Sequence, residues 1–266
     1  MTSTMIRKLN GLLKTDNVGK VLHYHDVLGS TNTELFRLAE NGASEGTAVI
    51  ADTQTQGRGR LDRTWISPAG VNLYISLLFR PSIPARGSPL LTLIASIAIV
   101  EVLKKNGVEK PVIKWPNDVQ IEGKKVAGIL TEMKPKGESV EFVIVGIGVN
   151  VNMTREDINS KMREASRVAT SIKEHVGRDV DRAKFTADLL LEIESWHKLF
   201  DKKGKSPILK EWTVRWGGME KRVRVSTDNN ETFQGTASGI DGDGHLLVKR
   251  DDGEVVTVVA GDVREL

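Results

Sequence analysis

The sequence predicts an α+β domain followed by a small β-barrel, and two observations support this fold class. Between residues 21 and 200, short apolar runs typical of strands alternate with segments of helical periodicity. After Gly217-Gly218 the chain changes to short strand-like runs separated by Asp, Asn and Gly turns, a texture typical of a small barrel. We therefore predict one domain over residues 1–217 and a second over residues 218–266.

Capping and stop signals delimit the predicted helices. At the N-terminus, Leu9, Leu12 and Leu13 suffice for one helical turn or a capping element, and not for a helix-turn-helix domain. A helix begins at the capping box that starts with Thr31 and ends at Asn41-Gly42. The next covers residues 90–105 and ends at Asn106-Gly107. The clearest covers residues 181–200, and we interpret its apolar stripe as core: Phe185, Leu189, Ile193, Trp196 and Phe200.

Apolar runs bounded by turn residues predict the strands. In the first domain we expect strands over residues 21–28, 46–52, 72–79, 112–114, 119–121, 126–133 and 140–151. Glu122-Gly123 supplies a tight turn between two of them. In the second domain we expect strands over residues 222–226, 233–239, 245–249 and 254–259, with turns at residues 228–230, 241–244 and 251–253.

Composition excludes several classes of protein. The 266 residues contain no cysteine, which excludes disulfides, thiolate nucleophiles and cysteine-ligated metal sites. The net charge of +3 is far below the clustered excess typical of a nucleic-acid-binding surface. We find neither a secretory apolar region nor an uninterrupted apolar run long enough to cross a bilayer. We therefore expect a cytoplasmic protein with no membrane partner.

A glycine-rich polar segment over residues 54–65 separates two predicted strands. It ends in GRGRLDRTW and carries Arg58, Arg60 and Arg63. Guanidinium groups match phosphate and carboxylate oxygens, and the Trp65 indole is suited to covering a flat ring. We interpret the segment as a lid that binds an anion. Composition alone favours a solvated basic loop or one that contacts RNA.

Two lysine-containing segments lie at strand ends. In Lys114-Trp115-Pro116-Asn117-Asp118, the lysine can neutralise phosphate charge, and Asn117 and Asp118 can orient a hydroxyl or a hydrated Mg²⁺. A tight turn with an Asx cap explains these residues equally well. Lys124 and Lys125 begin the next strand and alternate between its faces, so at most one of them reaches the site.

The strand over residues 140–151 ends in GIGVNVN. The motif lacks the third glycine and the helix onset of a dinucleotide fingerprint. We interpret Gly146 and Gly148 as allowing a flat ligand such as adenine to lie against the strand. His23 and His25 share one face of another strand, and we interpret them as structural or solvent-facing.

The order of these segments resembles that of the biotin protein ligases. Ser30-Thr31-Asn32-Thr33, GRGRLDRTW, KWPND, KKVAGILTE and GIGVNVN carry the resemblance from about residue 21 to residue 152. It implies a mixed, largely antiparallel sheet flanked by helices, as in biotin/lipoate ligases and class II synthetases, followed by an SH3-like barrel. It also implies a homodimer. Repressor members carry a winged helix-turn-helix segment that this sequence lacks, so we expect no DNA binding.

The resemblance implies a two-step ligase reaction. Biotin and ATP, with Mg²⁺, give biotinyl-5′-AMP, and a lysine of a biotin carboxyl carrier protein or domain then accepts the biotin. The implied biotin contacts are Ser30, Thr31, Asn32, Gln54, Arg58, Gly59, Arg60 and Lys125. The implied ATP and adenylate contacts are Arg60, Arg63, Trp65, Lys114, Asn117, Asp118 and Asn150. Arg58, Arg60 and Lys125 are implied to be catalytic, and Asp118 to meet Mg²⁺ through phosphates and water.

Two alternatives remain open from the sequence. A lipoate–protein ligase shares the fold and the adenylation chemistry, but its Arg-Arg-x-Ser-Gly-Gly-Gly-type segment is absent here. A non-catalytic module that binds nucleic acid or protein would use the basic loop and the barrel as contact surfaces. The catalytic order of the motifs and the small net charge argue against that module.

Overall fold

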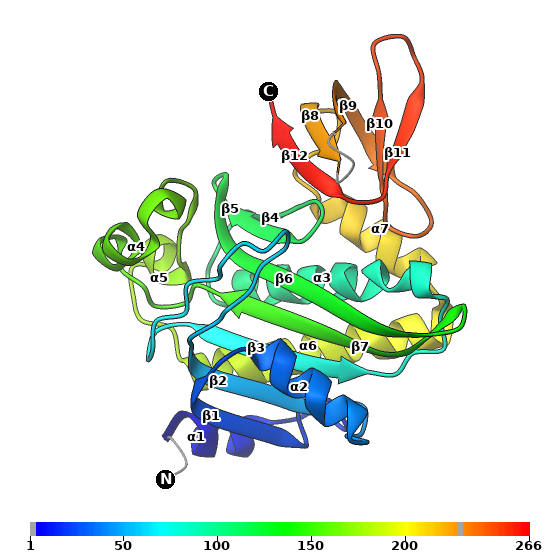
Figure 1. Ribbon diagram of the computed structural model, residues 1–266. Helices are drawn as coiled ribbons and strands as arrows, with labels where there is room; N and C mark the ends of the chain where they lie inside the picture. The colour runs from blue at the N-terminus through cyan, green and yellow to red at the C-terminus, as the bar shows by residue number, and fades with distance from the viewer. Residues whose placement is uncertain (1–3, 228–230) are drawn as a thin grey trace.

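The computed structural model describes residues 4–227 and 231–266, which form a larger α+β domain and a smaller β domain (Figure 1). The helices are α1 (Thr4–Leu12), α2 (Thr31–Glu40), α3 (Pro89–Lys105), α4 (Arg155–Met162), α5 (Ile172–Val176), α6 (Arg182–Lys203) and α7 (Ser206–Arg215), with the 3₁₀ turns η1 (Ala85–Gly87) and η2 (Arg163–Val168). The strands are β1 (Leu22–Leu28), β2 (Ala48–Gln54), β3 (Leu73–Phe79), β4 (Pro111–Lys114), β5 (Asp118–Ile121), β6 (Lys124–Lys136), β7 (Ser139–Val149), β8 (Arg222–Thr227), β9 (Thr232–Ile240), β10 (Leu246–Lys249), β11 (Val255–Val258) and β12 (Gly261–Glu265).

The larger domain is built on a sheet with the strand order β1-β2-β3-β7-β6-β5-β4. β1 and β2 pair in parallel, and the other neighbours pair antiparallel. The predicted mixed, largely antiparallel sheet is therefore confirmed. Every residue of β3 is buried, as expected for a strand whose two faces are both covered.

Helices cover both faces of this sheet (Figure 1). α2 packs on one face against β2, β3 and β7, while α3 packs on the other face against β4 to β7. α1, α6 and α7 form an outer layer, with α6 and α7 packed on α3. The stretch Ala85–Lys105 is long and apolar enough to cross a membrane, but 78% of its apolar 18-residue window is buried inside the protein. It is therefore the core helix of the domain.

Several elements differ from the prediction. α1 extends over nine residues rather than one turn, because Ile6 and Leu9 are buried and the helix packs on α6. α4 was not predicted, since only Ile158 and Met162 of its polar sequence are buried. α5, α7 and η2 were also missed, as was β12, whose five residues include one apolar side chain, Val263. The predicted turn at residues 228–230 lies outside the described residues.

The C-terminal strands β8 to β12, hereafter the C-terminal barrel, form an antiparallel sheet with the strand order β11-β10-β9-β8-β12. Its core includes Val225, Ala237 and Leu246, each fully buried. Trp115 in the β4–β5 turn donates through Nε1 to the Gly244 carbonyl at 3.1 Å. This contact attaches the barrel to the edge of the larger domain, above α3 and α7 (Figure 1).

Candidate active site

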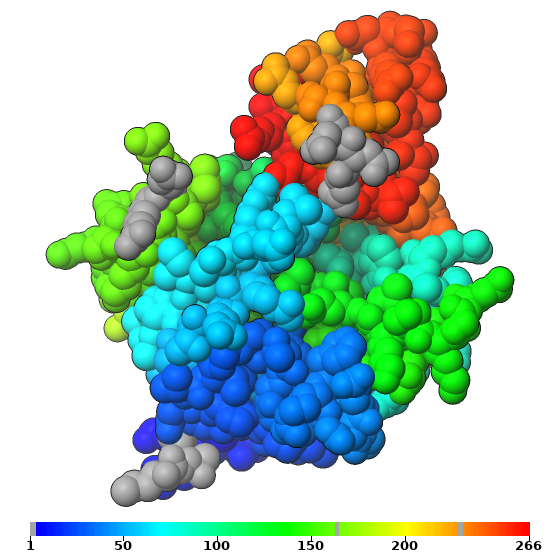
Figure 2. All heavy atoms as spheres, in the orientation of Figure 1, coloured from blue at the N-terminus to red at the C-terminus, as the bar shows by residue number. Residues whose placement is uncertain are grey.

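A pocket of about 890 Å³ lies over the α2 face of the sheet. Its volume is within the range of about 300–1,000 Å³ found for small-molecule sites. The arginine loop (residues 55–66), which follows β2, forms one wall; it crosses the front of the molecule towards the C-terminal strand (Figure 2). All of the residues predicted from the sequence line this pocket: Ser30, Thr31, Asn32, Gln54, Arg58, Gly59, Arg60, Arg63, Trp65, Lys114, Asn117, Asp118, Lys125 and Asn150.

One end of the pocket is a buried hydrogen-bond network at the start of α2, hereafter the neutral end. The Thr31 amide and hydroxyl both donate to Gln54 Oε1, at 2.9 and 3.1 Å. Ser76 Oγ on β3 lies 2.8 Å from Thr31 Oγ1 and 2.6 Å from Asn32 Oδ1. The Asn32 amide nitrogen donates to the Leu130 carbonyl at 3.1 Å. Each side chain thus fixes the rotamer of the next.

Two residues of the neutral end add to what the sequence indicated. Ser76 was missed, although a fully buried serine within the apolar run LYISLLF is itself a signal, because a buried hydroxyl needs a partner. Ser30 is the N-cap residue of α2, yet in the described chain its side chain makes no capping hydrogen bond. Its hydroxyl, on the pocket wall, is therefore not committed to the helix.

Glycines on β6 and β7 make room for side chains from across the pocket. A Cβ at Gly146 would overlap the Asn32 amide, and a Cβ at Gly148 would overlap the Trp65 indole. A Cβ at Gly128 would lie 2.9 Å from the same indole. The predicted contact between these β7 glycines and a flat ligand is thereby corrected, since Asn32 and Trp65 themselves lie against the glycines.

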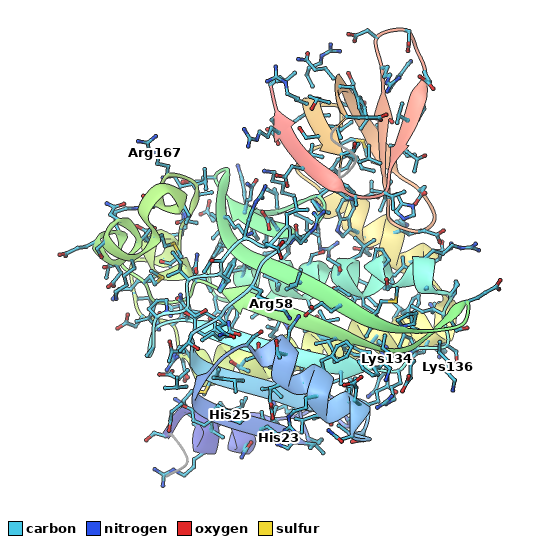
Figure 3. The ribbon with its side chains drawn as sticks, in the orientation of Figure 1. His23, His25, Arg58, Lys134, Lys136 and Arg167 are labelled. Carbon is cyan, nitrogen blue, oxygen red and sulfur yellow. The ribbon has the colours of Figure 1, made fainter. Side chains whose placement is uncertain are left out.

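The adjoining part of the pocket, hereafter the charged end, carries the arginines of the loop. It meets the neutral end at Glu132, which accepts a hydrogen bond from the Asn32 amide at 2.6 Å. Arg58 Nη2 lies 3.0 Å from the Glu132 carboxylate on β6. Arg63 pairs with Asp262 on β12, and both terminal nitrogens of Arg60 lie 3.4 Å from the Gly261 carbonyl oxygen. Arg58 and Arg63 are half-exposed. Figure 3 shows Arg58 in front of β6, well away from His23 and His25 on β1, which do not line the pocket.

Lys125 contributes a further cation to the charged end. Its Nζ lies 2.6 Å from Asp118 Oδ1 and 5.2 Å from the centre of the Trp65 ring. Lys124, its neighbour on β6, is exposed, as period-2 alternation requires. The Asn117 amide donates to the Ile129 carbonyl at 2.7 Å and ties the β4–β5 turn to β6. This turn places Asp118 opposite Lys125.

The C-terminal barrel completes the charged end with Asp262, Val263 and Arg264, none of which the sequence analysis identified. Burial disfavours the charged form of Asp262. The hydrogen bond from Arg63 and the charges of Arg63, Arg60 and Arg264 outweigh this effect, and the pKa of Asp262 lies below its ordinary value. Asp262 therefore remains an anion that holds the arginine loop against the barrel.

The unpredicted elements after β7 close the remaining wall. Met162, Ala165 and Ala169 from α4, η2 and the residue after it line the pocket beside Asn150. Asn150 is buried and donates through Nδ2 to the Thr170 carbonyl at 3.0 Å. This bond fixes the segment after α4 against the end of β7. Met162, Ala165 and Ala169 thereby give this wall of the pocket an apolar surface.

Comparisons with known proteins agree with this architecture. Residues 24–150 match the biotin/lipoate A/B protein ligase family, and residues 219–264 match the biotin protein ligase C terminal domain. The chain is 42% identical to the bifunctional ligase/repressor BirA of Bacillus subtilis, over 91% of this chain and 73% of that protein. It is 33% identical to the biotin--[acetyl-CoA-carboxylase] ligase of Paracoccus denitrificans, over 87% of this chain and 95% of that protein.

The solved structure of the biotin protein ligase from Aquifex aeolicus in complex with biotin and ATP superposes with a TM-score of 0.78. The match has 29% sequence identity and covers 93% of this chain and 100% of that one. Fold, pocket and sequence similarity thus agree over both domains. The chain belongs to the biotin protein ligases, within the biotin/lipoate A/B protein ligase family.

Proposed function

We propose that this pocket activates biotin with ATP and then transfers it to a lysine of a biotin carboxyl carrier protein or domain. The observation that carries the proposal is the union of a buried neutral end and a cationic end in one pocket of about 890 Å³. Biotin has the matching asymmetry, with a neutral ureido ring at one end and a carboxylate at the other. The names of the relatives support biotin over lipoate as the substrate, and a ligase over a binding module.

Biotin would lie with its ring at the neutral end. Ser30, Thr31, Asn32 and Gln54 offer hydroxyl and amide groups to the donors and acceptors on the two edges of the ureido group. Because the rotamers of Thr31, Asn32 and Gln54 are fixed by hydrogen bonds to one another and to Ser76, little conformational entropy is lost when the ring binds.

The charged end would carry out the adenylation. The biotin carboxylate attacks the α-phosphorus of ATP, a new C(O)–O–P bond forms, and pyrophosphate leaves with the electron pair of the broken P–O bond. Two anions approach each other in this step, so Arg58, Arg60 and Lys125 stabilise the developing charge. Gly59 lets the backbone of the loop approach the ligand closely.

The nucleotide would occupy the wall formed by the barrel and the elements after β7. Arg63, Lys114 and Arg264 supply cations for phosphate oxygens, and Trp65 and Asn150 flank the adenylate. Mg²⁺ is held in such enzymes largely by substrate phosphates together with one or two carboxylates, and Asp118 supplies a carboxylate. Among the side chains that the structure describes, no group of three His, Asp or Glu able to hold a metal occurs. When bound, Mg²⁺ neutralises phosphate charge.

The second step forms an amide. The neutral ε-amine of the carrier lysine attacks the acyl carbon, and the acyl C–O bond breaks. AMP leaves with that electron pair, and the amine gives one proton to solvent. The adenylate is hydrolysed if water enters first, which gives the arginine loop a reason to close over it.

Incubation of the purified protein with Mg-ATP and either biotin or lipoate tests the proposal. We expect biotin-dependent pyrophosphate release and, with a carrier protein present, biotin bound to one lysine. Release with lipoate alone would assign the chain to the lipoate ligases. If folded protein releases no pyrophosphate with either biotin or lipoate, the proposal is overturned.

The proposal includes a cytoplasmic homodimer, as the family resemblance implies. Light scattering coupled to gel filtration measures the oligomeric state, and a monomer under adenylate-forming conditions would contradict it. The absence of DNA binding stays a prediction, which a mobility-shift assay tests.

A further inference from the structure

A second, smaller cavity of about 210 Å³ adjoins the active-site pocket. The two share a wall that includes Arg60, Asn117 and Leu130. This side cavity lies between the two domains. Its remaining walls come from the N-terminal turn of α3 and the neighbouring part of β6 on one side, and from the barrel on the other. It therefore borders the charged end of the active-site pocket, where the adenylate would form.

The walls of the side cavity are largely uncharged. Pro89, Leu93 and Val259 contribute apolar surface, and Thr92 and Thr131 contribute hydroxyls that lie 2.7 Å apart and can satisfy each other. Among the residues that line it, only Arg60 and His245 can carry a charge. A pyrophosphate or triphosphate group requires several cations, so these walls do not suit it. The volume is also below the range of about 300–1,000 Å³ for small-molecule sites.

One occupant fits these properties. A lysine side chain has an apolar four-carbon stem, which favours apolar walls, and a polar tip, which must reach the adenylate. We propose that the side cavity is the passage through which the lysine of the carrier protein reaches the adenylate. This inference rests on the proposed function and adds the route by which the second substrate enters.

The passage would also prepare the amine for attack. The nucleophile is the neutral amine, whereas a lysine in water is almost entirely protonated at neutral pH. Apolar walls disfavour the charged ammonium, and the Arg60 guanidinium at the inner end does so again by like-charge repulsion. Both effects lower the pKa of an arriving lysine, so the passage activates it and directs its proton outwards to solvent.

Narrowing the passage from the barrel side tests the inference. Ala260 is a small, half-buried residue between β11 and β12 that lines the side cavity and not the main pocket. In Ala260→Trp we expect biotin-dependent ATP–pyrophosphate exchange to stay within twofold of the unsubstituted protein. Transfer to a carrier protein should fall at least tenfold, while transfer to hydroxylamine, a nucleophile small enough to pass, should persist. The matched control is Val255→Trp, an exposed position on β11 that lines neither cavity.

A second variant approaches the passage from the opposite wall. Ser88, at the N-cap of α3, lines the side cavity, so Ser88→Trp should reproduce the selective loss of carrier transfer. Normal carrier transfer in both variants would overturn the passage, and so would an equal loss of exchange, hydroxylamine transfer and carrier transfer. Absence of exchange in the unsubstituted protein would instead overturn the proposed function. The two failures are therefore distinguishable.

Discussion

The two ends of the active-site pocket are held by different kinds of contact. At the neutral end, Thr31, Asn32, Gln54 and Ser76 hydrogen-bond one another, and three of the four are almost fully buried. At the charged end, the arginines pair with carboxylates or carbonyls on other elements, and Arg58 and Arg63 remain half-exposed. Exposed ion pairs contribute only about 0–1 kcal/mol, so a ligand anion can replace the carboxylates at little cost. Ring recognition is thus built into the fold, whereas charge is supplied by groups that exchange partners.

Removal of Lys125 should have the largest effect, because the adenylation step depends on the charged end. In Lys125→Ala we expect biotin-dependent ATP–pyrophosphate exchange to fall by about 10²–10³-fold, the usual cost of losing one preorganised electrostatic contact. Lys124→Ala, which removes the exposed neighbour on the same strand, is the matched control and should retain full exchange. Full exchange in Lys125→Ala would contradict its role.

A single methyl group should break the neutral end. In Gly146→Ala the new Cβ displaces the Asn32 amide, which then loses its bonds to Ser76 and Leu130. Disrupting buried hydrogen bonds of this kind costs about 1–3 kcal/mol, so the Kd for biotin, measured by calorimetry, should rise roughly 10–100-fold. Gly11→Ala, where nothing lies within 4 Å of the new Cβ, is the control. Unchanged affinity in Gly146→Ala would show that the network is not needed for ring binding.

Loss of Arg60 should separate adenylate formation from adenylate retention. Arg60 holds the arginine loop to the Gly261 carbonyl, and we expect Arg60→Gly to fold normally and to release biotinyl-5′-AMP into solution. The expected result is a several-fold rise in biotin on lysines of a bystander protein, read by streptavidin blot. Arg60→Lys keeps the charge and tests whether the bidentate group is required. Unchanged target selectivity in Arg60→Gly would rule out this role.

The smallest effect is expected for the pair that joins the loop to the barrel. Because the side chain of Arg63 is half-exposed, Asp262→Asn should lower the free energy of unfolding by at most about 1 kcal/mol. The lowered pKa of Asp262 makes this contribution complete above the ordinary Asp pKa of about 3.9, and it is lost as the pH falls through the lower folded-state value. Chemical denaturation at several pH values should therefore show the two proteins converging in acid. A difference that grows as the pH falls would contradict the assignment.

The sequence was most informative where the signal is local. α2 and α3 follow from their stop residues, α6 from its apolar stripe, and β3 and β7 from apolar runs bounded by turns. The capping box predicted to start at Thr31 is wrong, because the N-cap residue of α2 is Ser30. α4 and β12 escaped prediction because they bury few side chains, so their apolar periodicity is weak. β12 is stabilised by its pairing with β8, which a short sequence window does not contain, whereas α4 packs mainly on η2, the element that follows it.

The sequence by itself determined which chemical groups the pocket uses. Hydroxyls and amides near residue 31, arginines in a glycine-rich loop and a lysine at a strand start all line the pocket of the folded protein. Only the tertiary structure decided their partners: Ser76 beneath Thr31 and Asn32, Glu132 beside Arg58, and Asp262 from the far end of the chain beside Arg63. The reason is physical. A side chain's chemistry is a property of its residue, whereas its partner depends on strand order and on the docking of the barrel, which bring together residues that are distant in sequence.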